Sequence, residues 1–531
     1  MANLSSGASA HATVDSVQRT HRDETLRGPS FATIASVGGE NRPVALLLSI
    51  LAEFHRQHLS YCYWRSTRRV SAALSGNSDL DLLIARDAQQ RCQTILLSGG
   101  FKLFPDTANR LHPALCSYLG YDEPSGRIVH VHVHSHLAVG EALLKNYLLP
   151  WEAAILARAA LHPTLPIKVL DPADEALLLV ARGSLERRRT DPVALRHWTA
   201  TSRKFELDRQ QLRERLEPAT LRNRAHAVFA DDVADMVVDG IFYGLPLERQ
   251  SRLQRRIRRE LAAYRTFNAV EARARSWTRA VLWVAGGLNQ NLLHAPRPWR
   301  RRVPGGGRVL AVIGVDGSGK TTVVGAIRKW LGAEVDVIPT YFGTGDGRPS
   351  LLLLPFKLMV PVIAPWFKAR PKSIAQGKSS RHPSELLYSV LLMVWATVVA
   401  IEKRNKLLAA HRGARRGLIV VADRYPHSEE LDFNDGPLLA QLRKVPLWLR
   451  RLEAGPYALA RRLPPDLVIK LTVTPETAAR REPDMDPAVA LQRIDALQRL
   501  TFPGARVVSI NADQPLAEVI RAIKREVWGL L

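Results

Sequence analysis

Cysteine is scarce in this sequence: its 531 residues include only Cys62, Cys92 and Cys116. The three lack the close, paired spacing of metal ligands, and they are too few for the disulfide framework that holds small secreted domains together. We therefore exclude a disulfide scaffold and a cysteine-ligated metal module. The same scarcity predicts a protein of the reducing cytoplasm.

Acidic residues are also few relative to basic ones. The chain has 50 Asp and Glu against 75 Lys and Arg, which gives a formal net charge of +25. Such an excess favours anionic partners such as nucleotides, sugar phosphates or anionic lipid headgroups. Arginine on solvated helix faces produces the same excess, and we attribute most of the charge to that source. Nucleic acid is not expected as a partner.

No apolar run reaches the length of a membrane span. Residues 1–42 are rich in Ser, Ala, Thr and Gly, which predicts a disordered tail and not a signal peptide. The uncharged run Leu386–Ile401 is shorter than the ~20 residues that a spanning helix needs. We interpret this run as a buried helix, and peripheral contact with a membrane surface stays open as the alternative.

The length predicts two or three domains, and a hydrophobic content of 46% is enough to build their cores. Alternating strand-like and helix-like patterns occur at both ends of the chain, with a helical pattern between them. We predict an α/β domain over 43–145, a helical extension over 146–287, a Pro-, Gly- and Arg-rich linker over 288–306, and a second α/β domain over 307–531.

A phosphate-binding loop follows the apolar strand Val309–Ile313. Residues 314–321, GVDGSGKT, match the P-loop pattern at every fixed position, and Thr321–Leu331 has helical spacing. Backbone N–H groups of such a loop surround an anion at a helix N-terminus, where the helix dipole adds positive charge. The pattern predicts ATP and Mg²⁺ as cofactors, with the nucleotide held by Gly314, Gly317, Ser318, Gly319, Lys320, Thr321 and Thr322 and the metal by Thr321.

The loop, with its acidic residue Asp316, resembles that of thymidylate kinase and related nucleoside monophosphate kinases. Further segments occur in that family's order: VVADRY at 420–425, a strand and helix at 464–481, and a closing strand and helix at 507–523. The resemblance covers about Gly305 to Leu531. It implies a P-loop fold with a parallel sheet, and transfer of the γ-phosphoryl group of ATP to a nucleoside monophosphate or another small acceptor.

The resemblance also implies roles for single residues. Arg424 would hold an acceptor phosphate, Asp423 would orient the substrate or the water around Mg²⁺, and Asp316 would position the acceptor hydroxyl. Arginines 480, 481 and 493 resemble those that close over the phosphates. The implied catalytic set is Lys320, Asp316, Asp423, Arg424, Arg480 and Arg481, and the implied substrate contacts are Phe342, Arg348, Arg424 and Tyr425.

The sequence departs from the family at the acceptor side. The family's helix presents an Asp-Arg pair to the substrate phosphate, and by register that pair falls on Leu391 and Leu392. Because an apolar side chain cannot neutralise a phosphate, deoxythymidine monophosphate is not the expected acceptor. The sequence does not decide between a monomer and a homodimer.

A second motif lies near the N-terminus, where a Gly-Ser turn leads into Asp-x-Asp on a strand at 76–84. This segment resembles the nucleotidyltransferase superfamily. Asp79 and Asp81 point to the same side of a strand, so they are predicted to hold Mg²⁺ together. The superfamily takes a third carboxylate from a later strand. The matching strand, Arg127–His136, carries no acid, and the nearest carboxylates are Asp122 and Glu123.

Histidine alternates along that later strand, at positions 130, 132, 134 and 136. Alternating histidines can bind a transition metal. We interpret them instead as the half-exposed face of an edge strand, and the metal site stays as the alternative.

These motifs support three functions. The favoured one is an ATP- and Mg²⁺-dependent phosphotransferase acting on a small acceptor. The alternatives are nucleotidyl transfer at Asp79 and Asp81, and a non-catalytic nucleotide-dependent switch near the membrane.

Overall fold

The computed structural model describes residues 42–107, 112, 114–141, 144–186, 198–289, 292, 295–343, 383–430, 437, 439, 445–483 and 486–531. Arg348, which the family resemblance implies as a substrate contact, and residues 1–41 of the predicted tail lie outside these ranges. The chain forms two compact units, Met1–Gly286 and Gly287–Leu531, and each is described by itself.

The first unit is built on a seven-stranded sheet with the order β3-β4-β5-β2-β1-β9-β8. Strands β2 and β5 pair in parallel, whereas β4 and β5 form an antiparallel hairpin. The bounds are β1 Tyr61–Tyr63, β2 Leu80–Ile84, β3 Lys102–Leu103, β4 Leu115–Asp122, β5 Arg127–His134, β8 Ala160–Leu161 and β9 Lys168–Val169, with a separate pair β6 Leu137–Val139 and β7 Tyr147–Leu149.

Helix α2 (Ala45–Arg56) illustrates how the sheet is covered. Its buried residues are Leu47, Ile50, Leu51 and Phe54, the spacing of one helix face, and they join the core with strand residues such as Leu82. The other helices beside this sheet are η2 Thr67–Arg69, α3 Val70–Leu74, η3 Arg86–Ala88 and α4 Gln89–Ser98.

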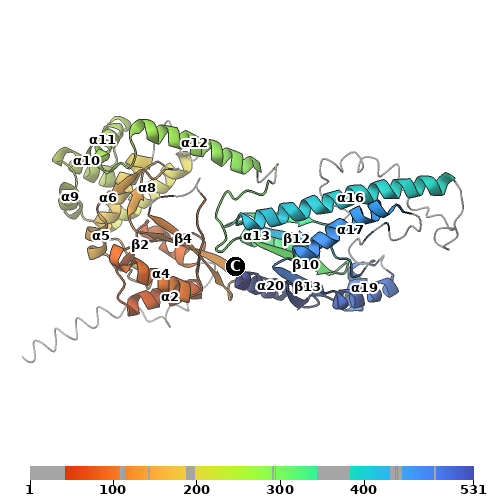
Figure 1. The fold of residues 1–531 in the computed structure, drawn as a ribbon. Helices are drawn as coiled ribbons and strands as arrows, with labels where there is room; N and C mark the ends of the chain where they lie inside the picture. The colour runs from red at the N-terminus through yellow and green to blue at the C-terminus, as the bar shows by residue number, and fades with distance from the viewer. Residues whose placement is uncertain are drawn as a thin grey trace, which may run out of the picture. The chain divides into compact units, whose positions relative to one another are not determined.

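The rest of the unit is mainly helical (Figure 1). Its helices are α5 Glu152–Arg158, α6 Pro172–Glu186, α8 Trp198–Arg215, α9 Pro218–His226, α10 Asp231–Phe242, α11 Leu247–Glu260, η4 Leu261–Tyr264 and α12 Ala269–Leu288. The prediction of a purely helical segment over 146–287 is wrong at its start, because β7, β8 and β9 lie there. Strands of two or three residues are too short to produce a readable alternation.

The edge-strand interpretation of the histidine segment is also wrong. Strand β5 lies between β4 and β2, and His130 and His134 are buried. Whether a strand is an edge depends on partners from distant parts of the chain. The alternation within 127–136 carried no information about those partners.

The second unit contains a five-stranded sheet in the order β11-β12-β10-β13-β14, and every pairing in it is parallel. The three central strands, β10, β12 and β13, are almost wholly buried, as their apolar sequences require. The strands are β10 Arg308–Gly314, β11 Val337–Tyr341, β12 Ile419–Asp423, β13 Leu467–Thr472 and β14 Arg506–Asn511. The helices are α13 Lys320–Leu331, α16 Pro383–Arg415, α17 Leu447–Arg462, α18 Pro475–Arg481, α19 Pro487–Arg499 and α20 Leu516–Leu530. The predicted α/β fold class is confirmed.

The apolar run Leu386–Ile401 lies in the long helix α16 (Figure 1). The prediction of a buried helix holds for one face only: Leu392 and Ala396 are buried, whereas Val390 and Val394 are exposed. Within the described part of the chain, no helix combines the length and the apolar character needed to cross a membrane.

Candidate functional site

The turn between β10 and α13 has the backbone of a loop that wraps around an anion. Gly317 and Gly319 have φ of 77° and 89°, in the left-handed region that favours glycine. Gly319 caps α13, and Ser318 N donates to Val315 O at 3.2 Å. Gly314 is needed for a different reason, because a Cβ there would overlap Ser318 Oγ. The glycines at these three positions therefore follow from the shape of the loop.

The side chain of Asp316 contacts three cationic side chains, one from the same loop and two from distant parts of the sequence. Its carboxylate lies 3.4 Å from Lys320 Nζ, 3.2 Å from an Arg424 nitrogen and 2.6 Å from an Arg493 nitrogen. Lys320 Nζ also donates to Val315 O at 2.8 Å. Lys320, Arg424 and Arg493 are thus all paired with one carboxylate that belongs to the loop itself.

The same cluster shifts the ionisation of its members. Partial burial acts against the charged form of Asp316, but Lys320, Arg424 and Arg493 outweigh it and lower the pKa of this carboxyl. Burial lowers the pKa of Lys320, and the nearby Arg424 adds to that shift while Asp316 opposes it. A lowered pKa keeps Asp316 a carboxylate that accepts hydrogen bonds.

Asp423 lies at the carboxyl end of β12, beside the loop. Strand β12 pairs with β10, with Asp423 in register with Val312, and Thr321 Oγ1 donates to Asp423 Oδ2 at 3.5 Å. Asp423 Oδ1 is buried and has no hydrogen-bond partner among the described residues. Burial raises the pKa of Asp423, although Lys320 and Arg424 oppose the shift. The carboxyl ends of parallel strands are where open α/β sheets bind ligands.

Arg424 has an unusual backbone. Its φ is +66°, in the left-handed region that costs a residue with a Cβ roughly 1–2 kcal/mol. Its N–H donates to Val312 O at 3.0 Å, which fixes the turn after β12. The strained turn directs the guanidinium towards Asp316 on the loop.

Among the arginines predicted to close over phosphates, Arg481 and Arg493 contact the loop. Arg481 donates to Gly317 O at 3.3 Å and to Ala512 O at 3.1 Å, while Arg493 pairs with Asp316. Arg480 is exposed and forms no hydrogen bond or ion pair within the described part of the chain.

Phe342 and Tyr425 lie in the interior of the second unit. Both are almost fully buried, and their rings pack edge to face with centroids 5.6 Å apart. The hydroxyl of Tyr425 donates to Leu463 O and lies 3.1 Å from His411 Nε2. The structure therefore places these two predicted substrate contacts in the interior.

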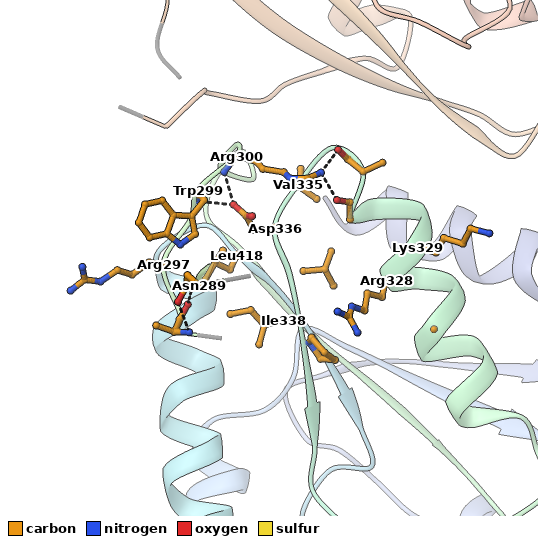
Figure 2. A pocket seen from close by; sticks show the side chains of 16 residues that line it. Asn289, Arg297, Trp299, Arg300, Arg328, Lys329, Val335, Asp336, Ile338 and Leu418 are labelled. Atoms are coloured by element: carbon orange, nitrogen blue, oxygen red, sulfur yellow. Dashed lines mark hydrogen bonds between the residues drawn. The ribbon is translucent and has the colours of Figure 1, made fainter. Parts of the chain in front are cut away.

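A cavity of about 560 Å³ lies at the amino-terminal ends of the strands, near the start of β11 and the last turns of α13 (Figure 2). Asp336 accepts hydrogen bonds from the backbone of Trp299 and Arg300, at 2.6 and 2.7 Å. Arg300 also donates to Gly332 O at 2.6 Å, at the C-terminus of α13. The cavity contains none of the loop residues that would bind phosphate.

The Asp-x-Asp motif of the first unit has nitrogen-rich surroundings. Asp81 lies 3.0 Å from Arg65 Nε and 3.0 Å from His134 Nε2, and Asp79 lies 3.0 Å from His130 Nδ1. Mg²⁺ prefers oxygen ligands, so these surroundings do not match the predicted magnesium site. Asp122 accepts from Leu46 N and Ser125 N, which ties it to the β4–β5 hairpin.

Arg65 is the residue of this cluster that sequence reasoning missed. It stacks on Trp64, 4.1 Å from the ring centroid, and pairs with a carboxylate 16 positions later in the chain. Neither contact leaves a pattern in the sequence.

Comparison with known proteins finds similarity to two proteins of Escherichia coli strain K12. The uncharacterized ATP-binding protein YghR is 28% identical over 245 residues, which are 45% of this chain and 91% of YghR. The uncharacterized ATP-binding protein YghS is 28% identical over 230 residues, 42% of this chain and 94% of YghS. No protein-family model matches the sequence.

Proposed function

We propose that the unit Gly287–Leu531 binds ATP with Mg²⁺ and transfers the γ-phosphoryl group to an oxygen of a small acceptor. One observation carries the proposal. A loop with two glycines in the left-handed conformation leads into Lys320 and Thr321, and these lie beside Asp423 at the carboxyl ends of the parallel strands. The similarity to YghR and YghS, two uncharacterized ATP-binding proteins, supports the binding of ATP.

Nucleotide binding would use the loop's cations. In the structure, Lys320 contacts Asp316 and Val315 O, and Arg424 and Arg493 pair with the same carboxylate. The phosphates of ATP carry more negative charge than one half-exposed carboxylate and offer these cations more acceptor oxygens. We expect Lys320 to leave Val315 O for the β- and γ-phosphates while the loop N–H groups bind the remaining oxygens.

Magnesium fits the pair Thr321 and Asp423. The hydroxyl and the carboxylate lie together, and Asp423 Oδ1 is a buried acceptor that has no partner within the described residues. A divalent cation would satisfy that oxygen directly or through water. Bound at these two residues, Mg²⁺ supplies charge neutralisation for the phosphates.

Transfer then depends on the groups around Asp316. The acceptor oxygen forms a bond to the γ-phosphorus, the bond from that phosphorus to the bridging oxygen breaks, and ADP leaves with its electron pair. The cations around Asp316 keep it ionised, so it would accept a hydrogen bond from the acceptor hydroxyl and orient it. Its lowered pKa makes it a weak base, so it would take the proton only late in the step, after the new bond to phosphorus has made that hydroxyl acidic. Arg424, Arg481 and Arg493 would stabilise the charge on the transferring group.

The acceptor differs from that of thymidylate kinases in this proposal. Leu391 and Leu392 occupy the positions of the acidic and basic pair, and Leu392 is buried against Ala396 and Leu449. An acceptor phosphate would have no countercharge there. We expect deoxythymidine monophosphate to be phosphorylated poorly, with kcat/KM below the ~10⁴ M⁻¹s⁻¹ that enzymes commonly reach.

The experiment is an acceptor screen on the full chain with γ-labelled ATP, paired with calorimetry for ATP binding. Lys320→Ala should abolish label transfer and weaken ATP binding. The matched control is Lys329→Ala, a change of the same kind at an exposed position in the last turn of the same helix, and it should leave both unchanged. Turnover that survives in the Lys320→Ala protein would remove the loop from the mechanism. ATP binding without transfer to any acceptor would favour a nucleotide-dependent switch.

A further inference from the structure

We propose that Asp79, His130 and His132 of the first unit form a binding site for a divalent first-row transition ion, with Zn²⁺ as the ion to test. This site is independent of the nucleotide site proposed above. It rests on a ladder of side chains that projects from two paired strands, β2 and β5.

The pairing register brings the ligands together. Strands β2 and β5 are parallel, with Asp81 opposite His132 and Leu83 opposite His134. Alternate residues of a strand share a face. Asp81 lies on β2 and Asp79 directly precedes this strand, while His130, His132 and His134 lie on β5. The result is a row of two carboxylates against three imidazoles.

The distances suit a metal coordination shell. His130 Nδ1 lies 3.0 Å from Asp79 Oδ1, and His132 Nδ1 lies 3.8 Å from Asp79 Oδ2. A tetrahedral ion with bonds of about 2.0–2.1 Å holds its ligand atoms about 3.3–3.4 Å apart. The two separations involve different oxygens of Asp79 and lie on either side of that value. Small rotations of the side chains would therefore bring three ligand atoms into tetrahedral positions and leave the fourth open.

A second triad overlaps the first, and the two compete. Asp81, His132 and His134 also bring ligand atoms within 4.8 Å of one another, but His132 offers the same Nδ1 to both. One nitrogen lone pair binds one ion. Arg65 already neutralises Asp81, with Nε at 3.0 Å from Oδ2, and its positive charge would repel a cation there. The triad of Asp79 is therefore the better site.

A hydrogen bond from His132 Nδ1 cannot pair with the carboxylates of both Asp79 and Asp81 at once. The Nδ1 of His132 lies between Asp81 Oδ1 at 3.3 Å and Asp79 Oδ2 at 3.8 Å, and one proton serves only one of them. Among the described residues, the neighbouring imidazoles of His130 and His132 are then the partners that offset the carboxylate charge of Asp79. A divalent ion offsets that charge and uses the nitrogen lone pairs as ligands.

The ligand types define the class of ion. Two imidazoles and one carboxylate suit zinc and other first-row transition ions, whereas magnesium prefers oxygen. The side chain of Asp79 is 49% exposed, which gives an ion access from solvent and leaves room for a water ligand. Three protein ligands with an open position is the arrangement of reactive metal sites, in contrast to closed structural ones.

The test uses the full chain without a histidine tag, stripped with a chelator, then equilibrated with Zn²⁺ and dialysed. Metal analysis should find about one Zn²⁺ per chain, and the Co²⁺ form should show the visible absorption of a nitrogen-containing site. Asp79→Asn and His132→Gln should each lower the zinc affinity at least tenfold. Because Asp79 is half exposed, its variant should fold normally, and circular dichroism checks this.

Two controls make the result specific. His136→Gln changes a histidine that contacts Arg86 and Glu152 outside both triads, and it should keep full zinc binding. Asp81→Asn should weaken zinc binding less than Asp79→Asn. No bound zinc in the folded protein, or binding that survives both Asp79→Asn and His132→Gln, would overturn the proposal. A larger loss in Asp81→Asn would overturn the choice of triad.

Discussion

Asp316 is the residue at which the charges of the phosphate loop meet. It binds the three cations that a nucleotide would need, so it competes with phosphate in the free protein and acts on the acceptor in the proposed reaction. These two effects have opposite consequences for binding and for turnover, and a single substitution separates them.

We expect Asp316→Asn to bind ATP at least as tightly as the unchanged protein, because Lys320, Arg424 and Arg493 lose a competing carboxylate. We expect its kcat to fall about 10²-fold or more, since a positioned acid or base contributes about 10²–10⁴ to a rate. Calorimetry and labelled-ATP kinetics measure the two quantities. Weaker ATP binding with an unchanged kcat would contradict the role assigned to Asp316.

Glu186, at the end of α6, provides a prediction on pH. Burial disfavours its charge, but Lys145 at 3.1 Å and Arg182 at 3.4 Å dominate and lower its pKa from 4.5 to about 2. Because the unfolded chain binds this proton at higher pH than the folded one, the stabilisation is complete above about 4.5 and is lost as the pH falls towards about 2.

Glu186→Gln should therefore lower the free energy of unfolding at neutral pH and reduce its decline below pH 4.5. Urea titrations at several pH values measure this. Glu271→Gln is the control, because that carboxylate forms an exposed i,i+4 pair with Arg275, and such pairs contribute about 0–1 kcal/mol. An equal effect of the two substitutions would show that the Glu186 pair is no stronger than a surface pair.

At this scale the sequence predicted the local features and missed the distant ones. Gly317 and Gly319 of the loop could be predicted because they lie close together in the sequence and their positive φ angles are a property of the backbone. The left-handed Arg424 and the pairing of Arg65 with Asp81 depend on strands meeting in space. No spacing of residue types encodes such a meeting.

At the scale of elements, long patterned segments were predicted well and short or partnered ones poorly. The strand β10 and the helix α13 differ by one residue at most from their predicted ends. Strands β8 and β9, of two residues each, gave no signal. The position of β5 inside the sheet was predicted wrongly. Its alternating histidines resemble a solvent-exposed face, and their pairing with Asp79 and Asp81 cannot be read from the strand alone.

Helix α16 allows a test of which apolar face supports the fold. Leu392 is buried with Ala396 and Leu449, whereas Val394 is 41% exposed. Leu392→Ala should lower the free energy of unfolding by about 2 kcal/mol or more, because it removes buried methyl groups and leaves a cavity. Val394→Ala should change it by no more than about 0.5 kcal/mol. Thermal or urea unfolding compares the two, and equal losses would mean that both faces are packed.

At the scale of the whole molecule, each candidate site is built from residues of one unit. The metal triad belongs to Met1–Gly286 and the phosphate loop to Gly287–Leu531. The match to YghR spans 245 residues and 91% of that protein, a length close to that of the second unit. The two sites share no residue, so we treat them as separate.

Separate sites should respond independently to substitution. Asp79→Asn with Asp81→Asn should leave ATP binding and phosphotransfer unchanged, and Lys320→Ala should leave zinc binding unchanged. Effects of distant, unconnected changes usually add to within about 0.3–0.5 kcal/mol. Calorimetry with ATP and with Zn²⁺ on the Asp79→Asn/Asp81→Asn protein, on Lys320→Ala and on the protein with all three changes forms a double-mutant cycle. The coupling free energy between the two sites should lie within that range. A larger coupling would mean that metal binding in one unit changes the nucleotide affinity of the other. The proposed zinc site would then regulate the proposed phosphotransfer.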